Sequence, residues 1–80
     1  MSIITYGVVQ ELYSLNGNER ISYGIVAYSD AENNGTATIV ASVNDITDER
    51  TKLESLVYNC NHLSLPLENL YDVVEDFLAG

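Results

Sequence analysis

The stretch ITYGVV at residues 4–9 returns almost unchanged as ISYGIV at residues 21–26, with the turn signal Asn16-Gly17 between the two copies. Asn-Gly is a preferred two-residue turn of antiparallel hairpins because both residues tolerate positive φ. Two similar strands on either side of such a turn predict a long antiparallel ribbon. The expected strands cover about residues 3–14 and 19–29.

The ribbon has two distinguishable faces once Leu15 is paired with Asn18. One face is mostly apolar, and the other sets each glycine opposite a valine. The similarity of the two copies has two interpretations that stay open: a shared packing role for the Tyr-Gly pairs, or the general preference of aromatic and branched residues for strands. The apolar face carries Tyr6, Val8, Gln10, Leu12, Ile21, Tyr23, Ile25 and Ala27.

A third strand is expected at about residues 36–43, where Ala37, Ile39, Ala41 and Val43 alternate with other residues after a turn-rich loop. This strand carries no charge and no proline. In a three-stranded meander it is an edge, and an unguarded edge is normally covered or paired with another chain.

The hydrophobic spacing becomes helical after Val43, which predicts helices at about residues 47–61 and 66–78. Thr47 or Asp45 is the expected N-cap of the first helix, Asp48 and Lys52 form a favourable i,i+4 pair, and Asn61 suits a left-handed cap. The predicted fold class is therefore α+β, a three-stranded antiparallel meander followed by two helices packed on one face of the sheet. The expected core adds Leu53, Leu56, Val57, Cys60, Leu70, Val74 and Phe77 to Tyr6, Val8, Leu12, Ile21, Tyr23, Ile25, Ile39 and Ala41.

Composition indicates one small acidic domain. The chain has 80 residues, and its 12 acids against 3 Lys plus Arg give a net charge of −9, which argues against nucleic acid and anionic membranes as partners. A single cysteine, Cys60, makes no internal disulfide. We expect one domain over residues 1–80 and a cytoplasmic location, because no targeting or membrane-spanning pattern is evident.

The second helix carries four carboxylates and no base. They lie at i,i+3 or i,i+4 spacing, where like charges repel by about 0.2 to 0.5 kcal/mol per pair. A solvated face that keeps the protein soluble, a docking site for a basic partner and a hard-metal site all remain open; the metal site is the weakest, because one exposed helix lacks a wrapped oxygen cage. We call these four residues the acidic ridge: Glu68, Asp72, Glu75 and Asp76.

The sequence contains few residues that could act in catalysis. His62 is the only histidine, and Cys60 falls on the apolar stripe of its helix, which favours a buried inert thiol over a nucleophile. Neither residue has the spacing of a zinc site. The sequence therefore predicts no enzyme, no cofactor and no bound metal.

Three short motifs resemble a family of small uncharacterised proteins from Gram-positive anaerobic bacteria, a domain of unknown function. They are Tyr23-Gly24-Ile25, Cys60-Asn61, and Leu70 followed by the segment DVVEDFL at residues 72–78. The family pattern has a proline directly after the serine that precedes the last helix, whereas here Leu65 separates Ser64 from Pro66. The resemblance implies no activity, ligand or catalytic residue.

The functional expectation is a noncatalytic protein-interaction or regulatory module that forms a homodimer. The alternative is a small-molecule or metal-responsive binding domain. The dimer would use the edge of the third strand, the outer face of the sheet, or both, because apolar residues stand there where polar ones are usual. The expected dimer surface is Val9, Tyr13, Val26, Tyr28, Thr38 and Val40.

Overall fold

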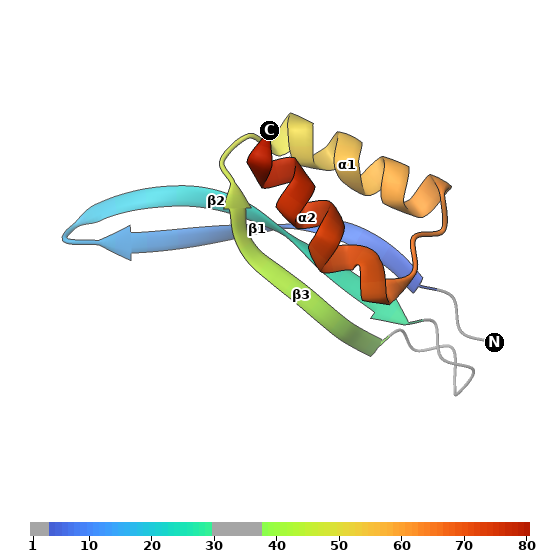
Figure 1. Ribbon diagram of the computed structural model, residues 1–80. Helices are drawn as coiled ribbons and strands as arrows, with labels where there is room; N and C mark the ends of the chain where they lie inside the picture. Colours follow the sequence, from blue (N-terminus) through green and yellow to red (C-terminus); the bar gives the residue numbers. More distant parts are fainter. Residues whose placement is uncertain (1–3, 30–37) are drawn as a thin grey trace.

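The computed structural model describes residues 4–29 and 38–80. Its elements follow the order β1 (Ile4–Leu15), β2 (Asn18–Ser29), β3 (Thr38–Thr47), α1 (Arg50–His62), the 3-10 helix η1 (Leu67–Asn69) and α2 (Leu70–Ala79). The strands form one antiparallel sheet in the order β1-β2-β3, and both α-helices lie on the same side of it (Figure 1). The predicted α+β class is confirmed.

The hairpin has the register predicted from its turn. Leu15 pairs with Asn18, and the pairing continues without a break to Ile4 and Ser29. Asn16 and Gly17 both have positive φ, at 52° and 82°, as a tight turn with the right twist requires. The residues of the turn and the apolar alternation of the strands indicate the same pairing, so the sequence alone predicted the register of the hairpin.

β3 departs from the prediction, because it runs to Thr47 and its pairing with β2 is irregular at two places. One irregularity lies between Ala27 and Tyr28 and the other between Tyr23 and Ile25. At the second, Asp45 has a φ of 55°. Such bulges add residues to one strand and change the direction of its side chains. The expected strand residues 36 and 37 lie outside the described part of the chain.

The helix boundaries also need correction. α1 begins at Arg50 with Glu49 as N-cap, so neither Thr47 nor Asp45 caps it; Thr47 Oγ1 instead accepts a hydrogen bond from the Glu49 N–H at 3.1 Å. Lys52 pairs with Glu49 at 2.9 Å rather than with Asp48, which lies before the helix. η1 precedes α2, so the α-helix proper starts at Leu70, four residues after Pro66.

Asn61 has a different role from the predicted cap. Ser64, with a φ of 52°, takes the left-handed conformation after α1. The Asn61 amide reaches the edge of the sheet, where its Oδ1 accepts from the Tyr6 N–H at 2.7 Å and its Nδ2 donates to the Tyr6 carbonyl at 2.9 Å. The Tyr6 hydroxyl donates to the Leu65 carbonyl at 2.8 Å. These bonds join the start of β1 to the end of α1.

The core lies between the helices and the wider end of the sheet. Most of the expected core residues are there, and Ile46, which was not expected, is turned inward. Three expected members are wrong: Leu12, Ile21 and Ile39 are 62%, 44% and 61% exposed. The buried cluster is Tyr6, Ile25, Ala27, Ile46, Leu53, Val57, Cys60, Leu70 and Val74.

Leu12 and Ile21 are exposed because the hairpin extends past the helices. We call residues 11–22 the hairpin arm; it projects to the left of the helical layer in Figure 1. The radius of gyration is 13.7 Å and the extents are 45 × 29 × 18 Å, whereas a compact chain of this length has a radius of gyration of about 12 Å. The molecule is a small packed body with a two-stranded extension.

Candidate functional site

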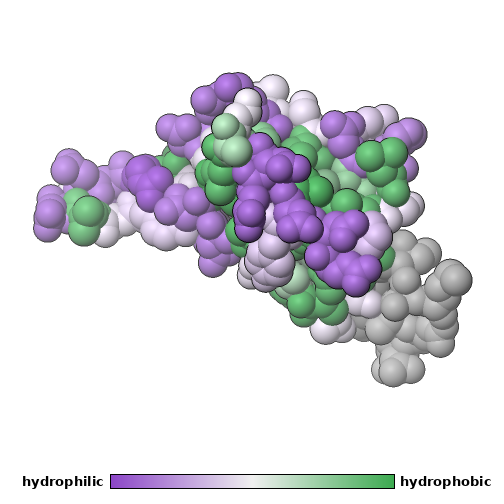
Figure 2. All heavy atoms as spheres, viewed as in Figure 1, coloured by the Kyte–Doolittle hydropathy of each residue, from purple (hydrophilic) through white to green (hydrophobic). Residues whose placement is uncertain are grey.

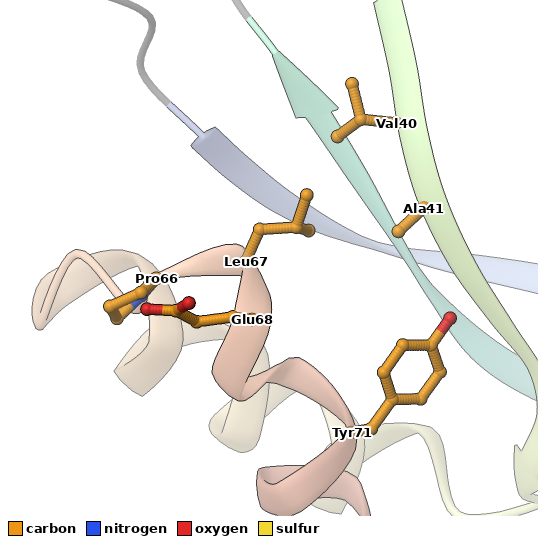
Figure 3. A pocket seen from close by; sticks show the side chains of 6 residues that line it. All are labelled: Val40, Ala41, Pro66, Leu67, Glu68 and Tyr71. Atoms are coloured by element: carbon orange, nitrogen blue, oxygen red, sulfur yellow. The ribbon is translucent and has the colours of Figure 1, made fainter.

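A groove runs between β3 and the start of the second helical segment. Val40 and Ala41 line it from β3, and Pro66, Leu67, Glu68 and Tyr71 line it from the other side (Figure 3). Its volume is about 580 Å³. Neighbouring residues of a regular strand face opposite sides, so the irregular pairing beside Val40 explains how both strand residues border one groove. Most of the groove wall is apolar, with one carboxylate at its rim.

The groove lies next to a free sheet edge. Within the residues that the structure describes, β3 has a neighbouring strand only on its β2 side. Among the described residues, no hydrogen bond joins the main chain of residues 38–43 to anything other than β2. On the opposite edge, by contrast, Asn61 occupies both main-chain groups of Tyr6. Free N–H and C=O groups on an edge strand can accept an added strand.

All four residues of the acidic ridge are exposed. Glu68 borders the groove from η1, while the other three continue along α2. Within residues 4–29 and 38–80, none of the four forms an ion pair. In Figure 2 hydrophilic atoms cover the outward side of α2, beside hydrophobic atoms that belong to the sheet side. The groove and the free edge therefore lie beside unneutralised negative charge.

The predicted dimer surface is divided by the structure. Val26 is 4% exposed and is not available for contact, partly because Tyr28 and Val26 both pack at Gly7. Val40, which strict alternation assigns to the outer face, borders the groove instead. Val9, Tyr13 and Tyr28 are half-buried, and Thr38 is exposed.

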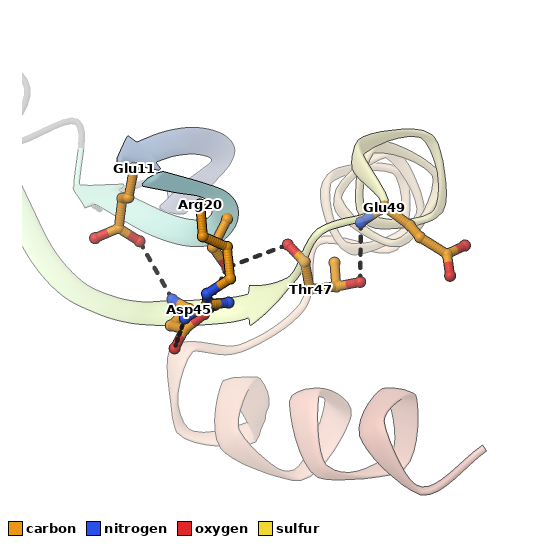
Figure 4. A network of polar contacts seen from close by, with 6 residues as sticks. Glu11, Arg20, Asp45, Thr47 and Glu49 are labelled. Carbon is orange, nitrogen blue, oxygen red and sulfur yellow. Dashed lines mark hydrogen bonds and ion pairs between the residues drawn. The ribbon is translucent and has the colours of Figure 1, made fainter. Parts of the chain in front are cut away.

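A polar network holds the second irregularity of β3 (Figure 4). Both oxygens of Asp45 accept from the Arg20 guanidinium at 3.1 Å, and Asp45 Oδ1 accepts from the Ser22 hydroxyl at 2.6 Å. The Asp45 N–H donates to Glu11 Oε1 at 3.2 Å. The Arg20 guanidinium also lies 5.2 Å from the centre of the Tyr13 ring. The hydrogen bonds from Arg20 and Ser22 lower the pKa of Asp45.

Asp45→Asn is expected to reduce stability at neutral pH and to have less effect in acid. Asparagine tolerates positive φ, so the substitution removes the charge without disturbing the backbone. Because the pKa of Asp45 is lowered by folding, its contribution is present above the ordinary Asp pKa of about 3.9 and is lost as the pH falls through the lower folded value. Urea melts of both proteins at pH 7 and in acid measure this. An equal difference at both pH values would contradict it.

The residues considered for chemistry do not converge. Burial raises the pKa of the Cys60 thiol, which lies in the core at 4% exposure, so it has the environment of a packing residue. His62 is exposed at the end of α1 and stacks on Tyr58, with ring centres 6.0 Å apart. In the part of the chain that the structure describes, no group of three or more His, Cys, Asp or Glu side chains is placed to hold a metal ion. No helix described here has the length and apolar composition to cross a membrane.

Sequence reasoning found the acids but missed the apolar half of the groove. Leu67 and Tyr71 fall within the predicted helix at residues 66–78, and their position beside β3 depends on tertiary packing. Pro66 was the one local signal, because it marks where the chain turns to bring η1 against the strand.

A family model described as "Family of unknown function (DUF6514)" matches residues 1–80. The chain belongs to this family. No curated protein and no solved structure matches it. The resemblance noted from the sequence is thus confirmed at the level of a domain of unknown function, and membership in DUF6514 brings no known ligand or activity to the groove.

Proposed function

We propose that this DUF6514 chain is a noncatalytic protein-interaction module that takes an extended segment of a partner protein onto the free edge of β3. The observation that carries the proposal is the combination of that edge with the adjoining groove. An added strand would form main-chain hydrogen bonds with β3, and its alternate side chains would enter the groove between Val40 and Leu67. Main-chain bonding supplies affinity, and the groove supplies side-chain selection.

The charge beside the groove favours a basic partner segment. Glu68 borders the groove, and Asp72 follows one turn later on α2. A lysine or arginine on the added strand would meet these carboxylates at a partly desolvated rim, where complementary charge raises the association rate and selects the partner. The like charges of the acidic ridge repel each other and destabilise the helix, so helix stability does not account for them. Binding of a basic segment would give them a role.

A second copy is a poorer occupant of the same edge. Pairing two β3 edges would extend one sheet through both molecules and bring the two acidic ridges to the same side of it. Each copy has a net charge of −9, and exposed charges interact over a Debye length of about 8 Å at physiological salt. We therefore assign the β3 edge to a different, basic protein segment.

The proposed setting is the cytoplasm, where a lone buried thiol such as Cys60 stays reduced.

The test uses two synthetic peptides that differ only in charge. Both alternate valine and threonine as strand formers, one with flanking lysines and the other with flanking glutamates. In amide NMR spectra of the isotope-labelled protein, the lysine peptide is expected to shift the signals of residues 38–43 and of Leu67 and Tyr71, and to bind more weakly as salt rises. Shifts by both peptides alike, or by neither at about 1 mM, would refute the proposal.

Val40→Lys is expected to weaken binding of the lysine peptide by roughly tenfold or more, because it puts a competing positive charge at the groove wall. Val40 is 42% exposed, so the fold should survive. Ile39→Lys is the matched control: Ile39 is the preceding strand residue, is more exposed, and is not part of the groove. A second variant, Asp72→Asn with Asp76→Asn, should weaken binding and reduce its salt dependence while raising the melting temperature. Equal binding by the Val40 and Ile39 variants would contradict the assigned groove.

A further inference from the structure

The hairpin arm presents an apolar surface that the described residues of the molecule leave exposed. Leu12 and Ile21 are directly paired across the two strands and are 62% and 44% exposed. By alternation along β1 they share the face of Tyr6 and Val8, which pack in the core with the helices. The helical layer does not extend over the arm (Figure 1). An isolated two-stranded ribbon is marginally stable in water and needs packing on one face. The arm therefore lacks the cover that the rest of the sheet has.

The charge of the hairpin arm indicates which partner can cover its apolar face. The arm contains Glu11, Glu19 and Arg20, a net charge of −1, whereas the whole chain has −9. Two copies that meet through their arms thus bring together only a small part of the negative charge of the molecule. The other two bases of the chain, Arg50 and Lys52, stand at the start of α1. The Arg50 guanidinium lies 6.0 Å from the centre of the Tyr23 ring, so this end of α1 adjoins the base of the arm.

The shape permits the two copies to interlock. The arm and the end of the helical layer form a corner, with the start of α1 and the C-terminus of α2 facing along the arm (Figure 1). A cavity of about 610 Å³ opens at this end, lined by Lys52, Phe77 and Leu78 among others. Leu78 is 61% exposed. A ribbon laid antiparallel over the arm would point its tip toward this cavity.

We infer that the chain forms a two-fold homodimer in which the arms of the two copies pack face to face and antiparallel. The Leu12–Ile21 pair of one copy lies on the same pair of its partner, near the two-fold axis. The tip of each arm reaches the partner's helix ends, where Glu19 approaches the positively polarised start of α1 and the Arg50 guanidinium, whose Nε also donates to Glu54 Oε2 of its own helix at 3.0 Å. This two-fold interface is closed, because each arm packs on the arm of the other copy and neither arm is left to bind a third copy. It leaves the β3 edge free for the strand assigned to it above.

Sedimentation equilibrium of the parent and of Leu12→Asp tests the interface. The parent is expected to be a dimer, and Leu12→Asp to weaken association by roughly a hundredfold or more, because each dimer contains the buried charge twice. Leu63→Asp is the control: Leu63 is a similarly exposed leucine, at 73%, in the turn after α1. It should leave the dimer intact. Circular dichroism checks that both variants are folded, which exposure of the substituted positions allows.

Two further variants test the geometry. A cysteine at position 12, Leu12→Cys, should form an intermolecular disulfide near the axis under mild oxidation, whereas Leu63→Cys should not; Cys60 is buried and does not interfere. Glu19→Lys should weaken the dimer, and combining it with Arg50→Glu should restore part of the loss, because the two charges are exchanged across the interface.

A parent that stays monomeric at about 1 mM would overturn the inference. So would a dimer that Leu12→Asp and Leu63→Asp affect equally, or one in which Leu12→Cys forms no disulfide. These results are independent of the peptide experiment, because Val40→Lys changes only the β3 groove and Leu12→Asp only the arm. Failure of one proposal leaves the other standing.

Discussion

Gly24→Ala should destabilise the protein by roughly 3 kcal/mol or more, as expected when a group is forced into a space without room for it. A Cβ built at Gly24 would overlap the Val43 carbonyl oxygen and lie 3.0 Å from the Asn44 Cα. Both contacts are with the main chain of β3, which cannot rotate away as a side chain can. The substitution must separate β3 from β2 at the bulge that Asp45 and Arg20 hold in place.

Gly7→Ala is the matched control, because Gly7 occupies the same position in the first copy of the repeated strand. A Cβ there would have ordinary contacts, at 3.7 Å from Tyr28 and 3.8 Å from Val26. It should be neutral or stabilising by up to about 1 kcal/mol, because alanine restricts the unfolded chain. Urea unfolding of the two variants measures both effects. Equal losses would show that the two Tyr-Gly pairs have the same packing role, against the structure.

Ile25→Ala should lower the free energy of unfolding by about 3 kcal/mol, the usual loss when a fully buried aliphatic side chain is truncated. Ile25 has 0% exposure and sits in the middle of the core on the central strand. A domain of this size has a total stability of about 4 to 12 kcal/mol, so the variant should melt far below the parent. Thermal and urea melts provide the measurement.

Phe77→Ala should lower the free energy of unfolding by less than Ile25→Ala does, although the sequence places both residues in the expected core. Phe77 is only half-buried, at the rim of the cavity between the helix ends. Ile39→Ala serves as a surface control and should change stability by no more than about 0.5 kcal/mol. A loss at Ile39 as large as that at Ile25 would contradict the register given for β3.

The register of the hairpin could be predicted because three signals agree there. Asn16-Gly17 sets the turn, the repeat sets the strand lengths, and apolar alternation sets the faces. The third strand could not be predicted in the same way, since its two irregularities shift the side chains after them. Ile39 moves to a position opposite Tyr28, and Ile46 turns into the core. No residue type in β3 indicates these shifts in advance; at the second one, Gly24 lets the main chain of β3 approach closely at Val43 and Asn44.

The candidate site was predictable in its charges and not in its shape. Helical spacing identified the acidic ridge as a solvent-facing row, and all four residues are exposed. The groove needed the position of η1 against β3, which depends on how two segments far apart in sequence pack. Similarly, alternation predicted an apolar arm face at Leu12 and Ile21, but the length of the helices decided that this face has no cover within one copy.

The bonds that Tyr6 makes have a consequence for how the protein is made. Its main chain is held by Asn61 and its hydroxyl by Leu65, at separations of 55 and 59 residues. A nascent chain therefore cannot fasten its first strand to α1 until about four fifths of the 80 residues have left the ribosome. The hairpin, whose contacts are local, can form well before that, whereas docking of the helical layer must wait for the distant contacts and for their loop-closure entropy. During synthesis the hairpin can thus form first, with its helix-facing side exposed, and the helices cover that side last.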